Sequence, residues 1–416
     1  AALNWLINYH CDGLRVDMTK FMCSDYTMKQ LIAEINFHSP NTFMIAEDGR
    51  DNDARVTKPF PQEERDENEI NHHSFIKKIS YNEISLSSLG FDTEWDFPFH
   101  KQIASSVLGI WDCRPKNICN FDYSLRDAQT RVKYPMSHDE IGNMDGTRLI
   151  TKIMVNELGI NQKVCELSHP LICKQIAHCA QRIVDALVSG KLEAMSDKER
   201  EEFFLKNALD KNTSINDILK AYTNAIAIHK LVIGKVYSIP GAKMLFQGDE
   251  YADLSYFKFF RQFSIGKEPY LEDKGYASGL PAFLDSKLGT VQVCEKYSYI
   301  NKGVENFVRD LNILNEKNLA LNAGQIEKTI VNEQTDIHAI HARKIYNEVF
   351  SVSNFSNKPY DDNYGIMFPK GKWKETINSD DEKYAGNNIY INGNNVFEQF
   401  SHITIPPYGM IFFEKI

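Results

Sequence analysis

The sequence lacks several features that define large classes of protein. It contains eight cysteines in 416 residues, and no two of them form a C-x-x-C pair. No cysteine and histidine cluster has the spacing of zinc ligands, so we interpret the cysteines as reduced thiols of a cytoplasmic protein. No run of 18 apolar residues occurs, and no basic segment followed by an apolar one opens the chain. Neither a membrane span nor a secretory leader is therefore predicted.

An excess of positive charge is absent as well. The chain has 47 Lys and Arg against 56 Asp and Glu, which gives a net charge of −9. This balance argues against a nucleic-acid or anionic-membrane partner and allows a neutral one, such as a carbohydrate. Aromatic residues make up 12% of the chain, which suits stacking on sugars, although most are expected in the core. No phosphate loop, nucleophile elbow or flavin fingerprint is found, so no cofactor is predicted.

Helix-like and strand-like segments alternate through much of the chain. Helices are expected over residues 1–10 and 27–36, and the strand candidates are residues 11–17, 42–48, 88–97, 131–140 and 241–250. Strands that alternate with helices indicate a parallel sheet or barrel. Residues 155–235 are predicted to be helical, with capping boxes at Ser196–Glu199 and Ser214–Asp217. We expect them to form an inserted subdomain with a solvated, charge-rich surface.

The chain changes character near residue 330. Short β-rich runs separated by Gly-, Asn- and Pro-rich turns predict an all-β sandwich. The predicted domains are a partial catalytic barrel (1–150), a helical insertion (151–238), the end of the barrel (239–328) and a C-terminal β-sandwich domain (329–416).

An arginine and an aspartate stand two apart at the end of the first strand candidate. Residues i and i+2 of a strand share a face, so Arg15 and Asp17 are expected to project together. They would lie at the carboxyl end of the strand, where parallel barrels hold their active sites. A guanidinium beside a carboxylate favours its ionised form, which a nucleophile needs. Alone, such a pair is usually structural.

Other strand candidates also end in polar residues. These residues are Glu47 in "MIAEDG", His138, Asp139 and Glu140 in "SHDEIGN", and Gln247, Asp249 and Glu250 in "MLFQGDE". Glycoside hydrolysis needs two carboxyl groups, about 5–5.5 Å apart in retaining enzymes. Adjacent strands lie about 4.8 Å apart, so acids at neighbouring strand ends come into that range. The set of acids therefore indicates a glycosidase-type site.

Several aromatic residues are candidates to stack on glucose rings. Tyr134 and Tyr251 are the better candidates because they stand close to strand ends, whereas Trp373 is expected in a core. The remaining candidates are Trp95, Trp111 and Phe246. His72 and His73 are assigned to a solvated loop.

The acidic segments are similar to the ordered motifs of the α-amylase superfamily, glycoside hydrolase family 13. "GLRVD" resembles its second conserved region, which implies Asp17 as nucleophile and Arg15 as its partner. "IAED" resembles the third region, which implies Glu47 as general acid/base. "SHDEIGN" resembles the fourth, which implies Asp139 as transition-state stabiliser with His138 on the same sugar. The resemblance implies a (β/α)8 barrel that binds an α-1,4-glucan or maltooligosaccharide, with Arg15, His138, Tyr134, Gln247 and Tyr251 as substrate-binding residues.

Two subgroups of the superfamily compete. "YHCDGLRVDM", "PGAKMLFQGDEYAD" and "FVRDLNILNEKNLAL" resemble 1,4-α-glucan branching enzymes, whereas "IAEDGRDNDARV" and "GFDTEWDFPFHKQI" resemble maltooligosyltrehalose trehalohydrolases. They differ in whether a sugar hydroxyl or water attacks the glycosyl-enzyme. Branching is favoured, and hydrolysis is the alternative. A third alternative is an inactive fragment or a glucan-binding scaffold.

The sequence departs from the family pattern in two ways. The first conserved region has no counterpart upstream of residue 13, and the helical insertion is longer than expected. The first three barrel strands are therefore expected to be missing, and the rest of a full-length protein would supply them. The open portion would have unsatisfied edges at the strands of Asp17 and Phe246. Because calcium ligands in the family come partly from the missing region, no metal is predicted.

Overall fold

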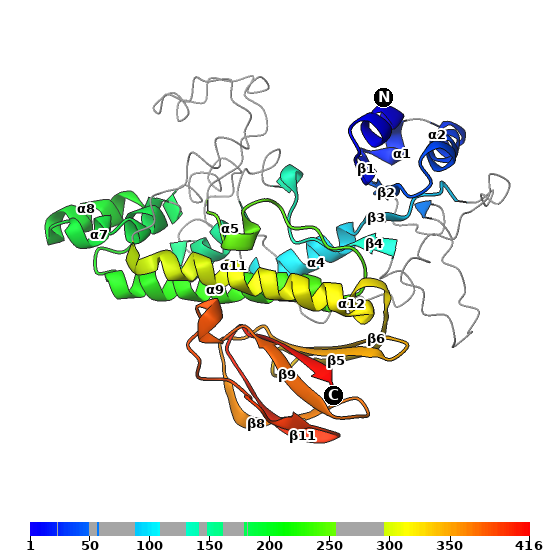
Figure 1. The fold of residues 1–416 in the computed structure, drawn as a ribbon. Coiled ribbons are helices and arrows are strands. Elements are labelled where there is room, and N and C mark those ends of the chain that lie inside the picture. Colours follow the sequence, from blue (N-terminus) through cyan, green and yellow to red (C-terminus); the bar gives the residue numbers. More distant parts are fainter. Residues whose placement is uncertain are drawn as a thin grey trace, which may run out of the picture.

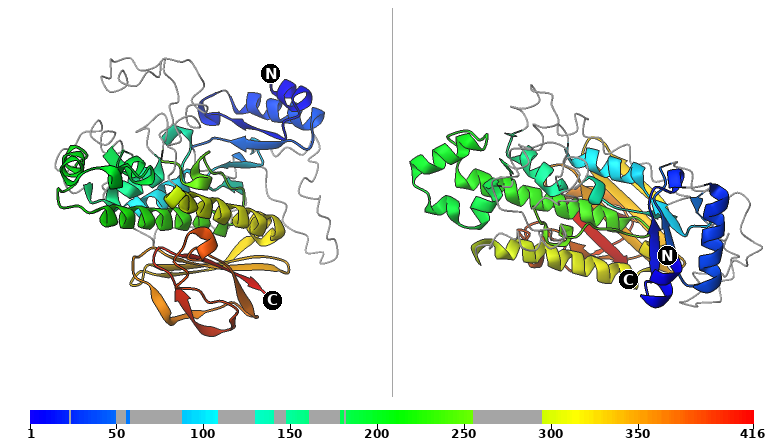
Figure 2. Two further views of the ribbon diagram at one scale, coloured as in Figure 1. Left: turned by 60° about the vertical axis from the view of Figure 1, so that its left-hand side comes forward. Right: turned by 90° about the horizontal axis from the view of Figure 1, so that it is seen from above.

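The computed structural model describes residues 1–22, 24–49, 56–57, 88–108, 130–140, 148–160, 179–180, 182–254 and 295–416. Within these ranges the chain forms a parallel sheet near its N-terminus, a central layer of helices and an antiparallel β domain (Figure 1). The parallel sheet lies at one end of the helical layer, and the helices α7 (Lys191–Ala194) and α8 (Asp197–Lys206) lie at the other end (Figure 2).

The parallel sheet follows the order of the chain. Its neighbouring strands are all parallel, in the order β1-β2-β3-β4. Their bounds are Gly13–Val16, Phe43–Ala46, Thr93–Trp95 and Arg131–Val132. Lys133 forms a parallel bridge with Lys243, so the fifth predicted segment joins beside β4. The expected set of consecutive parallel strands is confirmed, although each strand is short.

Side chains of β1 alternate between two environments. Leu14 and Val16 pack against Ile32 and its neighbours on α2 (Asp25–His38). Arg15 lies on the opposite face, where its guanidinium stands over the ring of Trp95. This alternation, which the pleat of a strand imposes, keeps the chemical face of β1 separate from its packing face. Among the described strands β1 pairs only with β2, so it forms one edge of the sheet.

The helices differ in how deeply they are buried. The longer ones are α4 (Phe97–Leu108), α5 (Leu149–Glu157), α8 (Asp197–Lys206), α9 (Ile215–Ser238) and α11 (Glu295–Lys317). The shorter ones are η1 (Asn4–Asn8), α1 (Thr19–Met22), α7 (Lys191–Ala194), η8 (Asp249–Tyr251), α12 (Leu319–Ala323) and η10 (Glu382–Tyr384). In the described ranges, none of the helices has the length and apolar character needed to cross a membrane.

The two predicted capping boxes are confirmed at the starts of α8 and α9. The expectation of a solvated surface holds for α8, in which Phe204 is buried and most other residues are not. For α9 this expectation is wrong, because every residue from Ile228 to Ser238 is buried. This half of α9 is mostly apolar, and its buried His229, Lys230 and Lys235 are hydrogen-bonded to other segments, so it lies within the core.

The C-terminal domain consists of two antiparallel sheets. The larger has the order β10-β9-β12-β7-β6-β5, and the smaller pairs β11 with β8. The strands are β5 (Gln325–Asn332), β6 (Ile337–Lys344), β7 (Asn347–Asn354), β8 (Tyr360–Met367), β9 (Trp373–Asn378), β10 (Val396–Phe397), β11 (Phe400–Ile405) and β12 (Met410–Lys415). The first of them begins slightly before the predicted boundary at residue 329.

Both faces of the six-stranded sheet are covered. On β12, Ile411 and Phe413 face the core shared with β8 and β11. Trp373 lies in the same core, as predicted. Met410 and Phe412 belong to the core that includes α9 and α11. Successive side chains of a strand point to opposite faces, so one strand contributes to two cores. The predicted β sandwich is confirmed, and it is joined to the helices by an apolar face.

Candidate active site

Two of the predicted acids lie side by side at the ends of paired strands. Val16 pairs with Ala46, so Asp17 and Glu47 directly follow matched positions of β1 and β2. The amide of Glu47 donates to the carbonyl of Val16 at 3.0 Å, which continues this register past the strand ends. The carboxyl ends of parallel strands meet at one edge of the sheet, where barrel active sites form.

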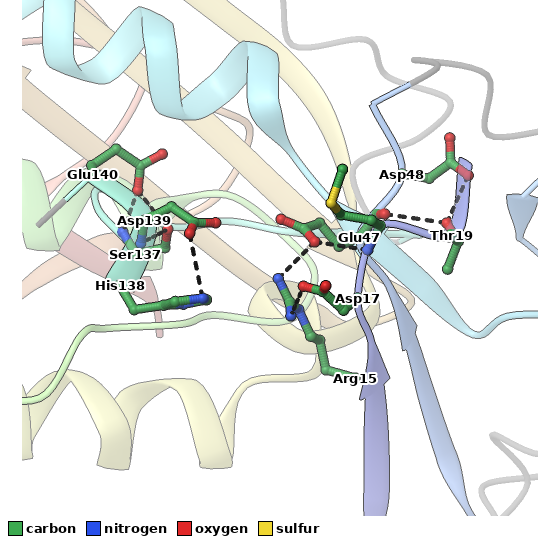
Figure 3. A network of polar contacts seen from close by, with 10 residues as sticks. Arg15, Asp17, Thr19, Glu47, Asp48, Ser137, His138, Asp139 and Glu140 are labelled. Carbon is green, nitrogen blue, oxygen red and sulfur yellow. Dashed lines mark hydrogen bonds and ion pairs between the residues drawn. The ribbon is translucent and has the colours of Figure 1, made fainter. Parts of the chain in front are cut away.

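Arg15 bridges these two carboxylates. Its Nη1 lies 2.6 Å from Oδ1 of Asp17, and its Nη2 lies 2.8 Å from Oε2 of Glu47 (Figure 3). The guanidinium also stands 4.4 Å from the ring centre of Trp95, a cation–π contact. The sequence predicted the partnership with Asp17. The sequence did not predict the contact with Glu47, through which one guanidinium pairs with both acids.

The two bridged acids differ in exposure. The Asp17 side chain is 62% exposed and the Glu47 side chain is 10% exposed. Burial raises the pKa of Glu47, although the Met18 amide (2.9 Å from Oε2) and Arg15 act to lower it. The nearby Asp17 carboxylate also raises that pKa. Two carboxyl groups in unlike environments are suited to unlike roles.

The turn after β1 is tied to the end of β2 by Thr19. Its hydroxyl donates to Oδ2 of Asp48 at 2.7 Å, and its amide donates to the Glu47 carbonyl at 3.0 Å. Between Asp17 and Thr19, Met18 adopts a left-handed conformation with φ of 42°. This turn directs the Met18 amide to the Glu47 carboxylate. Sequence reasoning missed Thr19, for which the only signal was the second acid of "IAED".

The third predicted acid faces the first two across the site. His138 and Asp139 follow β4, with His138 Nε2 3.6 Å from Asp139 Oδ1, and both side chains point toward the Arg15 group (Figure 3). The amide of Ser137 donates to Glu140 Oε2 at 2.8 Å, and the amide of Asp139 donates to the Ser137 hydroxyl at 3.2 Å. Asp139 and His138 are thus presented by a hydrogen-bonded turn.

The remaining predicted substrate-binding residues lie elsewhere. Tyr134 is fully buried between Trp95 and His100, so its ring offers no face to a sugar, in contrast to the prediction. The carbonyl of Gln247 accepts from Arg148 at 2.9 Å. Tyr251 lines a cavity of about 580 Å³ beside the start of α11, and the lining contains none of the three acids.

Some predictions fall outside the described residues, namely those for Trp111, His72 and His73. Within the part of the chain that is described, no group of three or more His, Cys, Asp or Glu side chains could hold a metal ion. The two cysteines in this part, Cys11 and Cys179, are both free.

Residues 332–415 match the family model for the alpha amylase C-terminal all-beta domain. Three solved structures share the fold over nearly the whole chain. An α-amylase from H. orenii matches 100% of this chain at 12% identity and a TM-score of 0.51. A pullulanase from Anoxybacillus sp. LM18-11, complexed with maltotetraose, matches 100% at 15% identity and 0.50. AmyP in complex with maltose matches 99% at 12% identity and 0.51.

The chain spans only part of the length of each of these structures. The chain covers 63% of the α-amylase, 45% of the pullulanase and 65% of AmyP. At these identities the likeness concerns the fold, and it confirms the predicted class: part of a (β/α)8 barrel followed by an all-β domain.

Proposed function

We propose that the chain belongs to the α-amylase superfamily and carries the catalytic acids of a retaining enzyme that acts on α-1,4-glucosidic bonds. One observation carries the proposal: Arg15 holds Asp17 and Glu47 together at adjacent strand ends, with Asp139 facing them. Two of the matched structures hold maltotetraose and maltose, which supports an α-glucan or a maltooligosaccharide as substrate.

In the first step, a carboxylate oxygen of Asp17 attacks the anomeric carbon. The bond from that carbon to the leaving oxygen breaks as Glu47 donates its proton to the oxygen. The exposure of Asp17 leaves it accessible to the sugar, and the burial of Glu47 favours the protonated acid that this step requires. A covalent glycosyl-enzyme results.

In the second step, Glu47 removes the proton of the acceptor hydroxyl. The acceptor oxygen then attacks the anomeric carbon and releases Asp17, so that the original configuration returns. Asp139 would stabilise positive charge on the ring, and His138 would hold the same sugar. Arg15 keeps its charge throughout and contacts both acids, so it would limit their repulsion when both are ionised.

The preferred acceptor is a sugar hydroxyl, as in a 1,4-α-glucan branching enzyme, because most of the resembling segments are of that type. The alternative is hydrolysis, as in maltooligosyltrehalose trehalohydrolase or another amylase-type enzyme. The exposure of Asp17 favours this alternative, because water reaches an open site. A branching enzyme would need further polypeptide along the open edge at β1 to exclude water from the glycosyl-enzyme.

A glucan assay separates these possibilities. The purified chain is incubated with amylose, and iodine staining and reducing ends are followed together. Loss of staining without new reducing ends supports branching, and new reducing ends support hydrolysis. Asp17→Asn tests the nucleophile, and Asp361→Asn, at an exposed position of β8, is the matched control. Intact glucan after incubation with the chain would overturn the proposal and favour a glucan-binding scaffold.

A further inference from the structure

A continuous set of aromatic contacts joins the two halves of the site. Trp95 lies at its centre and is 4% exposed. The guanidinium of Arg15 stands over Trp95, and the ring of His138 meets Trp95 edge-on with centres 6.0 Å apart. Tyr134 packs on Trp95 at 5.2 Å. Trp95 therefore touches both the group that holds Asp17 and Glu47 and the turn that carries Asp139.

His100 is at the far end of this set. Its ring lies parallel to the Tyr134 ring, with centres 5.2 Å apart and an interplanar angle of 1°. One ring nitrogen, Nδ1, is 2.7 Å from the carbonyl oxygen of Pro135, and the other, Nε2, is 3.2 Å from Oε1 of Glu140. Pro135 and Glu140 flank the turn that carries Asp139, so His100 contacts the chain on both sides of it.

Glu140, which contacts His100, is also hydrogen-bonded to the turn. Its other oxygen, Oε2, accepts from the amide and the hydroxyl of Ser137, at 2.8 and 2.5 Å. The Ser137 hydroxyl in turn accepts from the amide of Asp139. Burial acts to raise the pKa of Glu140, but His100 and the two Ser137 donors outweigh it and the pKa is lowered. An ionised Glu140 is the stronger acceptor for the two Ser137 donors, and its charge favours the imidazolium form of His100, whose pKa burial lowers.

We propose that His100 is a positioning residue, which fixes the Ser137–Glu140 turn and thereby the place of Asp139 opposite Asp17 and Glu47. This role rests on the proposed function, because it concerns Asp139 as a stabiliser of the transition state. A displacement of about 1 Å in such a group costs up to about a hundredfold in rate. His100 lies on α4, behind Tyr134, and takes no part in the bond changes.

The test separates the polar contacts of His100 from its stacking. His100→Phe keeps a ring against Tyr134 and removes both polar contacts, whereas His100→Gln keeps an amide donor and removes the ring. We expect His100→Phe to lower kcat by about tenfold to a hundredfold with little change in KM. His100→Gln should retain most of the turnover.

A matched control lies in the C-terminal domain. His341 is also buried, its Nε2 is 2.9 Å from Glu348 Oε2, and it meets Trp373 edge-on. His341→Phe removes the same kind of contact without touching the turn, so it should leave kcat unchanged. Equal losses of kcat in His341→Phe and His100→Phe would overturn the positioning role.

Amide hydrogen exchange tests the role without any turnover. The Ser137 amide is protected by Glu140, so His100→Phe should speed its exchange and His341→Phe should not. If the unmodified protein turns over no α-glucan, the proposed function fails, and the exchange comparison still decides the positioning role. Identical Ser137 exchange in His100→Phe and the unmodified protein would overturn it.

Discussion

The parallel sheet and the C-terminal β domain differ in how fully the rest of the chain buries their strands. Every residue of β1 is only partly buried, and large apolar side chains stand exposed around it, including Trp5, Tyr9, Phe21 and Phe37. In β6, by contrast, every residue from Ile337 to Ala342 is buried. The partly buried strand β1 positions two of the candidate site residues, whereas the C-terminal domain is covered on both faces of its larger sheet. Catalysis needs access, whereas a core needs exclusion of water.

The difference also shows in how charge is treated. At the open sheet, Arg15 and Asp17 remain partly exposed and pair with each other. At the closed domain, Lys230 of α9 is 2% exposed and donates to two backbone carbonyls, those of Ser379 and Tyr384. A buried charge without such donors and acceptors is costly. Charged residues are therefore partly exposed and paired with each other in one region, and buried and bonded to the backbone in the other.

The largest effect is expected from removing the nucleophile in the open region. Asp17→Asn should lower turnover by about three orders of magnitude or more, because no glycosyl-enzyme can form. The thermal midpoint should change little, since the side chain is largely exposed. Turnover by the variant within tenfold of the unmodified protein would remove Asp17 from the mechanism.

The second prediction concerns the proton of Glu47. Glu47→Gln should lower turnover by about 10²- to 10⁴-fold, because the leaving oxygen loses its acid. Because folding raises the pKa of Glu47, the folded state binds more protons than the unfolded state at pH values between the two pKa values. Glu47 thus stabilises the fold below its unfolded pKa, and this contribution is lost as pH rises through the folded pKa. Urea unfolding over a pH series measures this loss. The decrease in unfolding free energy that Glu47 contributes as pH rises should be absent in Glu47→Gln, and an identical pH dependence in both proteins would contradict the pKa direction.

The third prediction moves to the closed region. Trp373 is fully buried in the sandwich core, so Trp373→Ala should cost about 3–5 kcal/mol of unfolding free energy. Phe400→Ala, at a ring that is 60% exposed, is the control and should change it by no more than about 0.5 kcal/mol. Denaturant melts measure both. Comparable losses would mean that the two sheets of the sandwich do not pack as described.

The smallest effect is expected where α9 meets the β domain. Lys230→Met should cost about 1–3 kcal/mol because two buried carbonyls lose their donor. Burial lowers the pKa of Lys230 to about 8. The unfolded state therefore binds more protons above pH 8, and this group makes stability rise with pH from there toward 10.5. Lys220 is exposed on the same helix, so Lys220→Met should preserve the rise of the unfolding free energy with pH. Loss of this rise in Lys220→Met would contradict the assignment to Lys230.

Several features could be predicted from sequence because they are local. The i, i+2 spacing of Arg15 and Asp17 is a property of one strand, and the capping boxes of α8 and α9 are properties of four residues. The β-rich tail was recognised by its short runs and turns, and the matched family model covers residues 332–415. Local spacing was enough in each case.

Other features could not be predicted because they depend on pairing. The contact of Arg15 with Glu47 follows from the register between β1 and β2, which no single segment contains. Tyr134 was expected at the sugar, but Trp95 and His100, from a different segment, enclose its ring. Residues 155–235 were expected to have a solvated surface, whereas the second half of α9 packs against strands far along the chain.

The central claim is that Asp17 is the nucleophile of a retaining reaction. A fluorinated α-glucosyl fluoride that forms a slowly released glycosyl-enzyme tests it most directly, with proteolysis and mass spectrometry to locate the label. The account predicts one glycosyl group on the peptide containing Asp17, and none in Asp17→Asn. A label on Glu47, or turnover of the reagent with no covalent adduct and with inverted configuration, would contradict it.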